Sequence, residues 1–332
     1  MRSLFFRLFR ADLAHLWNNR RKFDADAVWA MSERELLLAV WLAWLTRRRS
    51  RPVLVGEVIW LIDDWPCFDP VRRWLWRVTL SAADCLLVAT EGSARKLCDI
   101  LPNANIRAYR FGIPLNVYTS LRDRPGLLEG AGRKRPVRVL AAGNDLRRDW
   151  ETVAKALGGD ERFDVTLLSR RTAVRDMAKF GANVHYQQAD RLSGLLERYR
   201  WADMVVIASL PNSHGAGMTM LLEAAAAGIP IICASTGFID EFFDEDSVTY
   251  VPPCDPAALK RAAAALAADP AEAAAKAKRA RRAITRLGYG SMDAVDRRCA
   301  IIRQCLWNSS LAAIDRPTAS SSTPAEPKAT PR

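Results

Sequence analysis

The sequence has few of the residues that metal and disulfide sites require. It contains three histidines, His15, His185 and His214, and seven cysteines, none of which form a C-x-x-C pair. A multi-histidine metal site, a zinc module and a disulfide framework are therefore not expected, and scattered cysteines favour a reducing compartment. The H-E-x-x-H motif of zinc proteases and the P-loop motif G-x-x-x-x-G-K-[ST] are also missing. We predict neither a metal nor another cofactor.

Long hydrophobic runs are absent as well. The longest, residues 36–45, is far shorter than the ~20 residues of a membrane span, so it predicts a buried helix. In residues 1–22, leucines and phenylalanines recur at helical spacing beside six basic side chains. This pattern predicts an amphipathic helix, which either lies on an anionic membrane or packs into the core with a solvated basic face.

Acidic residues are outnumbered by basic ones. The 332 residues include 49 Lys and Arg against 37 Asp and Glu, a formal net charge of +12. Such a charge attracts anions, among which nucleic acids, anionic lipids and phosphorylated small molecules are candidates. Nucleic acid is not expected as a partner, because the chain has no aromatic-interleaved basic motif and no helix-turn-helix pattern.

Short β-rich segments alternate with helical patterns along the whole chain, which is typical of parallel α/β sheets. The expected strands are 27–31, 53–62, 85–89, 106–111, 137–142, 164–169, 184–187, 204–208, 229–234 and 248–251. The expected helices are 72–82, 93–101, 150–157, 192–200, 218–227, 256–266, 276–287 and 291–311.

One stretch interrupts this alternation. Residues 121–136 are rich in Gly, Pro and charge, and they predict a linker between a domain at 1–120 and a domain at 137–290. A last helix is expected at 291–313, followed by a disordered tail at 314–332. The fold class is thus α/β, with two Rossmann-like, doubly wound domains that face a cleft, where ligands bind at strand ends.

The strongest candidate site lies in residues 201–240. An apolar strand is followed by a glycine-rich turn and a helix, and the turn and first helical residues are His214, Gly215, Ala216, Gly217, Met218 and Thr219. Backbone N–H groups at a helix start attract phosphate, although a purely structural turn is the alternative. Glu223 follows among leucines and alanines, and an acid in so apolar a helix needs a partner. A ribose would supply one through its hydroxyls.

Three segments carry a family resemblance. LLEAAAAGIPII at 221–232, VPPCDPAALKRAAAAL at 251–266 and RVLAAGNDLRRDWETVAKA at 138–156 resemble the donor-binding half of GT-B glycosyltransferases of the family 4, or group 1, type. Many such enzymes build bacterial exopolysaccharides or envelope polysaccharides. The resemblance implies a nucleotide-sugar donor, two Rossmann-like domains, no metal, and retention of configuration at the sugar.

The resemblance also implies roles for individual residues. Glu223 would bind the ribose, and an arginine after the Gly143 turn would neutralise the donor diphosphate. We favour Arg148 over Arg147 for this role, and the alternative is a surface ion pair with Asp145 or Asp149. Gly215 stands where the family carries a first acid, so His214 or backbone N–H groups would contact the transferred sugar instead.

The first domain carries a weaker signal. Asp63 and Asp64 end the apolar segment VIWLIDDWPCF at 58–68, which we interpret as a strand. Two carboxylates there would bind acceptor hydroxyls or act as a general base, and the alternative is helix capping. The opening strand and glycine-rich loop of the family are missing, so this domain is expected to be abbreviated.

The leading functional hypothesis is a glycosyltransferase. It would transfer a hexose from a UDP- or GDP-linked sugar to a saccharide or lipid-linked saccharide, in the cytoplasm, at the inner face of the cytoplasmic membrane. The alternative is a non-catalytic, degenerate GT-B module that binds a nucleotide sugar or a membrane within a biosynthetic complex.

Overall fold

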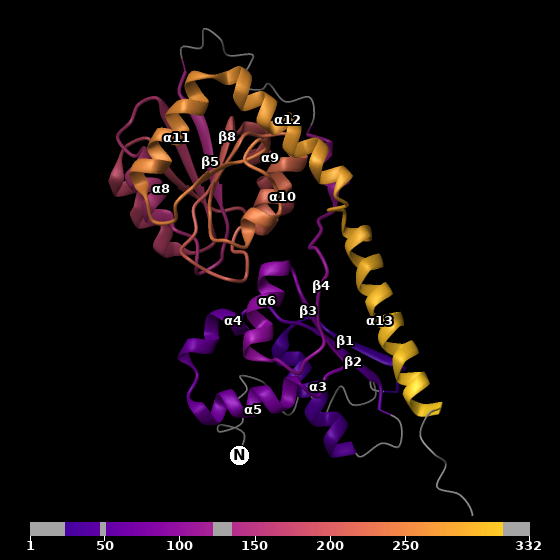
Figure 1. The fold of residues 1–332 in the computed structure, drawn as a ribbon. Coiled ribbons are helices and arrows are strands. Elements are labelled where there is room, and N and C mark those ends of the chain that lie inside the picture. The colour runs from indigo at the N-terminus through magenta and orange to yellow at the C-terminus, as the bar shows by residue number, and fades with distance from the viewer. Residues whose placement is uncertain (1–23, 47–50, 122–134, 315–332) are drawn as a thin grey trace, which may run out of the picture.

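The computed structural model describes residues 24–46, 51–121 and 135–314. Two parallel sheets form two domains, and the last helix runs from the C-terminal domain back along the N-terminal domain (Figure 1). The predicted helix at 1–22, the linker residues 122–134 and the tail beyond 314 lie outside the described residues.

The N-terminal domain is built on four parallel strands in the order β1-β2-β3-β4. The strands are β1 (Ala27–Ala30), β2 (Val53–Glu57), β3 (Cys85–Val88) and β4 (Ile106–Ala108). The helices are α3 (Glu33–Thr46), α4 (Leu61–Asp64), α5 (Pro70–Leu80) and α6 (Glu91–Ile100), with a 3₁₀ turn η2 (Trp65–Cys67); α7 (Leu115–Thr119) follows β4 but packs into the core of the C-terminal domain. Right-handed crossovers in an order without reversal place their helices on one face of the sheet. Leu36, Trp76 and Leu97 accordingly pack on Leu54 and Leu86 in one core cluster.

The other face of this small sheet is covered by helix α13 (Ser291–Ile314), which follows the C-terminal domain. Val53, Val55 and Leu87 alternate with the residues of the first core, and they pack with Cys305 and Ile301 of α13. The N-terminal domain therefore uses the end of the chain for its second helical layer.

The C-terminal domain holds six parallel strands in the order β10-β9-β8-β5-β6-β7, which reverses direction between β5 and β8. They are β5 (Val137–Ala142), β6 (Phe163–Leu168), β7 (Val184–Gln187), β8 (Met204–Ile207), β9 (Ile231–Ala234) and β10 (Thr249–Val251). The helices are α8 (Trp150–Leu157), α9 (Leu192–Trp201), α10 (Met218–Ala227), α11 (Pro256–Ala268) and α12 (Pro270–Arg286), with 3₁₀ segments η4 (Thr172–Phe180) and η5 (Ile239–Glu241). Ligands of doubly wound sheets bind where the strand order reverses, at the carboxyl ends of the strands.

Most of the expected strands and helices are confirmed, and one difference concerns a predicted site. The apolar run 36–45 is helical, as predicted, but only its first part is buried: Leu36 is fully buried, whereas Trp44 and Leu45 are 43% and 66% exposed. The expected strand at 53–62 stops at Glu57, and helix α4 follows. In the part of the chain that the structure describes, no helix has the length and hydropathy to cross a bilayer.

Candidate active site

A cavity of about 400 Å³ opens at the point where the order of the C-terminal sheet reverses. Its walls come from the ends of β5 and β6, from the loop after β8, and from the first turns of α10. Ile59 and Trp60 of the N-terminal domain close one side. The cavity therefore lies between the two domains, where the sequence predicted a cleft.

The glycine-rich loop forms the floor of this cavity. Gly215 and Gly217 both adopt positive φ angles, of 70° and 97°, which side chains other than glycine rarely tolerate. The loop is braced by Asn212, whose Oδ1 accepts the N–H of Ala216 at 2.9 Å, and by Ser209, whose hydroxyl donates to the Ala216 carbonyl at 3.0 Å. The first turn of α10 lines the cavity, and the first N–H groups of a helix have no partner within it. This floor is suited to an anion.

Arg148 supplies a buried positive charge to the same wall. Its residue surface is only 5% exposed, and its Nη2 contacts the sulfur of Met220 at 3.5 Å. Within the described residues its Nε and Nη1 have no hydrogen-bond partner. Burial lowers the pKa of Arg148 to about 10, so the guanidinium stays charged at neutral pH. A buried cation with unused donors is costly unless an anion binds it.

Two glycines make room for this guanidinium. A Cβ atom at Gly217 would lie 2.6 Å from Nη1 of Arg148, and one at Gly143 would lie 3.1 Å from its Nε. Gly143 also has a positive φ, of 145°. Both glycines were predicted to lie at the donor site, and in the structure both shape the pocket that holds Arg148.

The neighbouring Arg147 lies differently. It is exposed and does not line the cavity, and its backbone N–H donates to Oδ1 of Asp145 at 2.7 Å. Asp149 caps helix α8 by accepting the N–H of Thr152 at 3.0 Å. In the described structure, neither Asp145 nor Asp149 forms an ion pair with Arg148. The structure thus brings Arg148 to the site and leaves Arg147 outside it.

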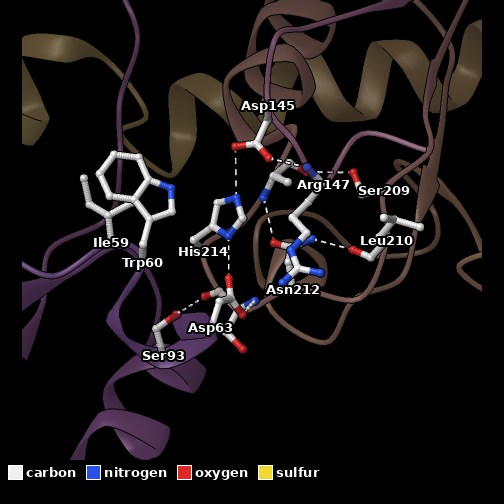
Figure 2. A network of polar contacts seen from close by, with 12 residues as sticks. Ile59, Trp60, Asp63, Ser93, Asp145, Arg147, Ser209, Leu210, Asn212 and His214 are labelled. Carbon is white, nitrogen blue, oxygen red and sulfur yellow. Dashed lines mark hydrogen bonds and ion pairs between the residues drawn. The ribbon is translucent and has the colours of Figure 1, made fainter. Parts of the chain in front are cut away.

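His214 connects the two domains through two carboxylates (Figure 2). Its Nδ1 lies 2.5 Å from Oδ2 of Asp63, in the N-terminal domain, and its Nε2 lies 3.0 Å from Oδ2 of Asp145, in the C-terminal domain. Burial alone would lower the pKa of His214, but the hydrogen bonds to Asp145 and Asp63 outweigh it and raise the pKa to about 9. At neutral pH both ring nitrogens therefore donate, and the ring cannot act as a base in this arrangement.

Glu223 lies on the cavity wall, where two tyrosine side chains of the chain itself hydrogen-bond to it. The residue is 8% exposed, and its Oε1 and Oε2 accept hydrogen bonds from the hydroxyls of Tyr118 and Tyr199. Burial raises the pKa of Glu223 against the opposing effect of the two tyrosines. Each carboxylate oxygen can accept a second hydrogen bond, so room remains for ribose hydroxyls on the cavity side.

The interpretation of residues 58–68 as a strand was wrong. Asp63 and Asp64 lie on the short helix α4 instead, and neither side chain caps it. Asp63 turns to the loop of the other domain, where it also accepts the N–H of Ser213 at 2.7 Å. Asp64 points elsewhere: it lies 3.9 Å from Nη2 of Arg34 and does not line the cavity. Among the described residues, Asp63 does not line this cavity or the smaller cavity beside it, and it contacts the site only through Ser213 and His214; Asp64 makes no contact with the site.

A smaller cavity of about 100 Å³ adjoins the first on the side of the N-terminal domain. Glu57 lies on its wall, and its carboxylate accepts hydrogen bonds from Nε of Arg298 and from the hydroxyl of Tyr109, both at 2.9 Å. The sequence analysis did not identify Glu57 and its two partners, nor Trp60, as site residues. The signal for Glu57 was the same as for Glu223, since each is an acid within an apolar segment.

No group of three or more His, Cys, Asp or Glu side chains in residues 24–46, 51–121 and 135–314 has an arrangement that would hold a metal ion. The cationic side chains that line the cavity are Arg148, Arg170 and His214, and backbone N–H groups add to their positive charge. The metal-free site stays a prediction.

Comparison with known proteins identifies the architecture. Residues 131–283 match the family described as Glycosyl transferases group 1. Among solved structures, the sucrose-phosphate synthase of Thermosynechococcus elongatus aligns with a TM-score of 0.68 at 19% identity, over 90% of this chain and 76% of that one. Residues 131–283 therefore form a group 1 glycosyltransferase domain, and the chain as a whole has the GT-B fold of these solved structures. The resemblance of its sequence to this family is thus confirmed, as is the α/β fold class with two Rossmann-like domains.

Two further solved structures share the GT-B fold. HepE of Anabaena, in complex with UDP and glucose, aligns with a TM-score of 0.66 at 13% identity, over 91% of this chain and 80% of that one. A glycosyltransferase from Rickettsia africae aligns with a TM-score of 0.68 at 12% identity, over 92% and 82% of the two chains. A search of curated proteins found no match. At these identities the structural likeness concerns the fold.

Proposed function

We propose that this GT-B protein transfers a hexose from a UDP- or GDP-linked sugar to a saccharide or lipid-linked saccharide. One observation supports the proposal most directly: the buried Arg148 has two unused donors on the wall of the cleft, beside the first turn of α10. A diphosphate there would accept bidentate hydrogen bonds from the guanidinium and further bonds from the helix N-terminus. Solved proteins of the same fold include one in complex with UDP-glucose.

The remaining groups fit a nucleotide sugar in this position. Glu223 would accept the ribose hydroxyls through its free lone pairs while the two tyrosines hold its carboxylate in place. The sugar would then extend toward His214, Gly215 and the small cavity beside Glu57, where the acceptor would enter. Because Gly215 carries no side chain and both N–H groups of His214 are engaged by Asp63 and Asp145, hydrogen bonds to the sugar would come from backbone N–H groups of the loop.

Transfer joins an oxygen of the acceptor to C1 of the sugar while the bond from C1 to the diphosphate breaks. The electron pair of that bond stays on the diphosphate, whose growing charge Arg148 would stabilise; one such donor contributes roughly 3–4 kcal/mol. His214 already donates from both nitrogens, so we assign the acceptor's proton to the departing diphosphate oxygen. Attack on the face that the diphosphate leaves gives retention of configuration.

Titration calorimetry with UDP and GDP tests donor binding. Arg148→Ala should weaken binding of the diphosphate, whereas Arg147→Ala, its exposed neighbour, should leave it unchanged. Equal affinities of the two variants would contradict the proposed site.

A donor panel incubated with membrane extract then tests transfer, and the anomeric configuration of the product tests retention. Binding without hydrolysis or transfer of any donor would favour the alternative, a module that binds nucleotide sugars without turning them over. Gly215, in place of the family's first acid, is the observation that keeps this second function open. A lipid-linked acceptor and attachment to the inner membrane are parts of the proposal.

A further inference from the structure

Helix α5 of the N-terminal domain has two apolar faces. Trp76 and Leu80 on one face are buried in the domain core. On the opposite face Val71, Trp74 and Val78 follow at spacings of three and four residues, and they are 62%, 61% and 45% exposed. A helix that serves only the core would carry polar residues on this outer face.

Helix α3 also carries exposed apolar side chains. Trp41 of α3 donates from Nε1 to the hydroxyl of Thr79 on α5 at 3.3 Å, so the two helices are in contact. One turn later Trp44 and Leu45 are 43% and 66% exposed, and the rings of Trp41 and Trp44 lie 5.6 Å apart. We call Trp44, Leu45, Val71, Trp74 and Val78 the α3/α5 face. Both helices lie at the end of the N-terminal domain that points away from the C-terminal domain (Figure 1).

Basic residues outnumber acidic ones around this face, where the acids include Asp69 at the N-cap of α5 and Asp99 beside Val78. Helix α5 contains three arginines, Arg72, Arg73 and Arg77, and no acidic residue. In the sequence, α3 is followed at once by three further arginines at 47–49. Exposed tryptophan and aliphatic side chains with an arginine rim suit the boundary between lipid head groups and acyl chains, where tryptophan is enriched and arginine meets phosphate.

We propose that the α3/α5 face docks onto an anionic phospholipid surface. Charge argues against two other occupants of this face, a second copy of the chain and residues 1–22 of the same chain. A second copy of the chain, docked through the same face, would place arginines against arginines. Residues 1–22 carry six basic side chains and one acidic one, so charge does not favour their packing on this face either.

Docking through this face would also set the distance between the membrane and the cleft. Glu33, the first residue of α3, accepts the N–H groups of Ile59 and Trp60 on the cavity wall at 3.0 and 3.2 Å. The 14 residues of α3 span about 20 Å between that wall and the α3/α5 face. The cleft would thus lie within reach of a saccharide carried on a lipid, a consequence that rests on the proposed function, whereas docking itself does not.

Co-sedimentation of the full chain with phosphatidylcholine vesicles, with and without phosphatidylglycerol, tests the proposal. We expect binding that needs the anionic lipid and weakens at high salt. The variant Trp74→Ser/Val78→Ser should bind at least about tenfold more weakly, since two large apolar side chains would no longer be buried. A second variant, Trp44→Ser/Leu45→Ser, should show the same loss independently. Circular dichroism identifies any variant that fails to fold.

Two controls separate this proposal from its rivals. Trp307→Ser removes an exposed tryptophan of α13, which is 67% exposed and lies outside the face, and should bind as the unaltered chain does. UDP binding should stay unchanged in the α3/α5 variants, which separates this test from that of the proposed function. Unaltered vesicle binding by both folded variants would overturn the proposal, and so would loss of a dimer in place of loss of vesicle binding.

Discussion

Replacing Arg148 by methionine should make the ligand-free protein more stable and its nucleotide binding weaker. In the ligand-free structure the guanidinium is buried while two of its nitrogens have no hydrogen-bond partner within the described residues. Methionine keeps an apolar side chain of similar length against Trp150 and removes the buried charge. If Arg148 serves to bind a ligand and destabilises the ligand-free protein, its replacement should raise stability and weaken ligand binding.

The size of the effect follows from the two unused donors. A buried donor without a partner costs about 1–3 kcal/mol. Against this, the variant loses the interaction of the guanidinium with the ring of Trp150, about 0.5–1 kcal/mol. A net gain of at least about 1 kcal/mol in the free energy of unfolding would raise the melting temperature by about 2–4 °C in a domain of this size.

When UDP is present, the unaltered protein should gain more stability than Arg148→Met. At 100 times its dissociation constant, UDP stabilises the unaltered protein by about 2.7 kcal/mol, or roughly 5–10 °C. Loss of charged hydrogen bonds to the diphosphate should weaken binding by about 100-fold, which leaves about 0.4 kcal/mol at the same concentration.

Differential scanning fluorimetry with and without UDP measures both effects. Arg147→Met is the matched control, because that arginine is exposed and outside the cavity, and it should change neither quantity. If Arg148→Met lowers the melting temperature without nucleotide and keeps the full shift with UDP, the reasoning is refuted.

Three further predictions concern the loop and its partners. The hydrogen bonds from His214 to Asp63 and Asp145 should stabilise the contact between the two domains fully below pH 6.5, the ordinary pKa of histidine. This stabilisation should be lost as pH rises through about 9, the pKa of His214 in the folded protein. Thermal unfolding of His214→Gln and of the unaltered chain across this pH range measures it. Glu223→Gln should weaken UDP binding by about tenfold or more through its ribose contacts, as calorimetry would show. Gly217→Ala should abolish UDP binding, since its Cβ would lie 2.4 Å from Ile207 and against Arg148, whereas Gly237→Ala, with a positive φ but open space, should only lower stability by about 1–2 kcal/mol.

Each of these three has a clear contrary result. A difference between His214→Gln and the unaltered chain that persists unchanged at pH 10 would show that the charged bridge is not its source. Undiminished UDP affinity of Glu223→Gln would remove this acid from the ribose site. Equal effects of the two glycine variants would mean that backbone strain, and not the space for Arg148, sets the role of Gly217.

The donor half of the protein was readable from the sequence because its signals are local. Alternating apolar strands and helices predicted the C-terminal sheet to within one or two residues at most ends, and the glycine turn before α10 lies where expected. Arg148, to which the family resemblance assigned the diphosphate, lines the cavity. The first domain was less readable, because an apolar run cannot by itself tell a strand from a strand followed by a short helix. This is why Asp63 and Asp64 were assigned to a strand end.

What the sequence determined by itself is which elements form, since periodicity, glycine turns and capping residues act over a few neighbouring residues. Only the tertiary structure decided which side chains contact one another. Tyr118 donates a hydrogen bond to Glu223, 105 residues away in the sequence, and Asp63 binds His214, 151 residues away. It also decided that α13 completes the N-terminal sheet. No local pattern encodes these pairings, because they depend on how two separately formed sheets pack, and that packing is set by burial and charge summed over both domains.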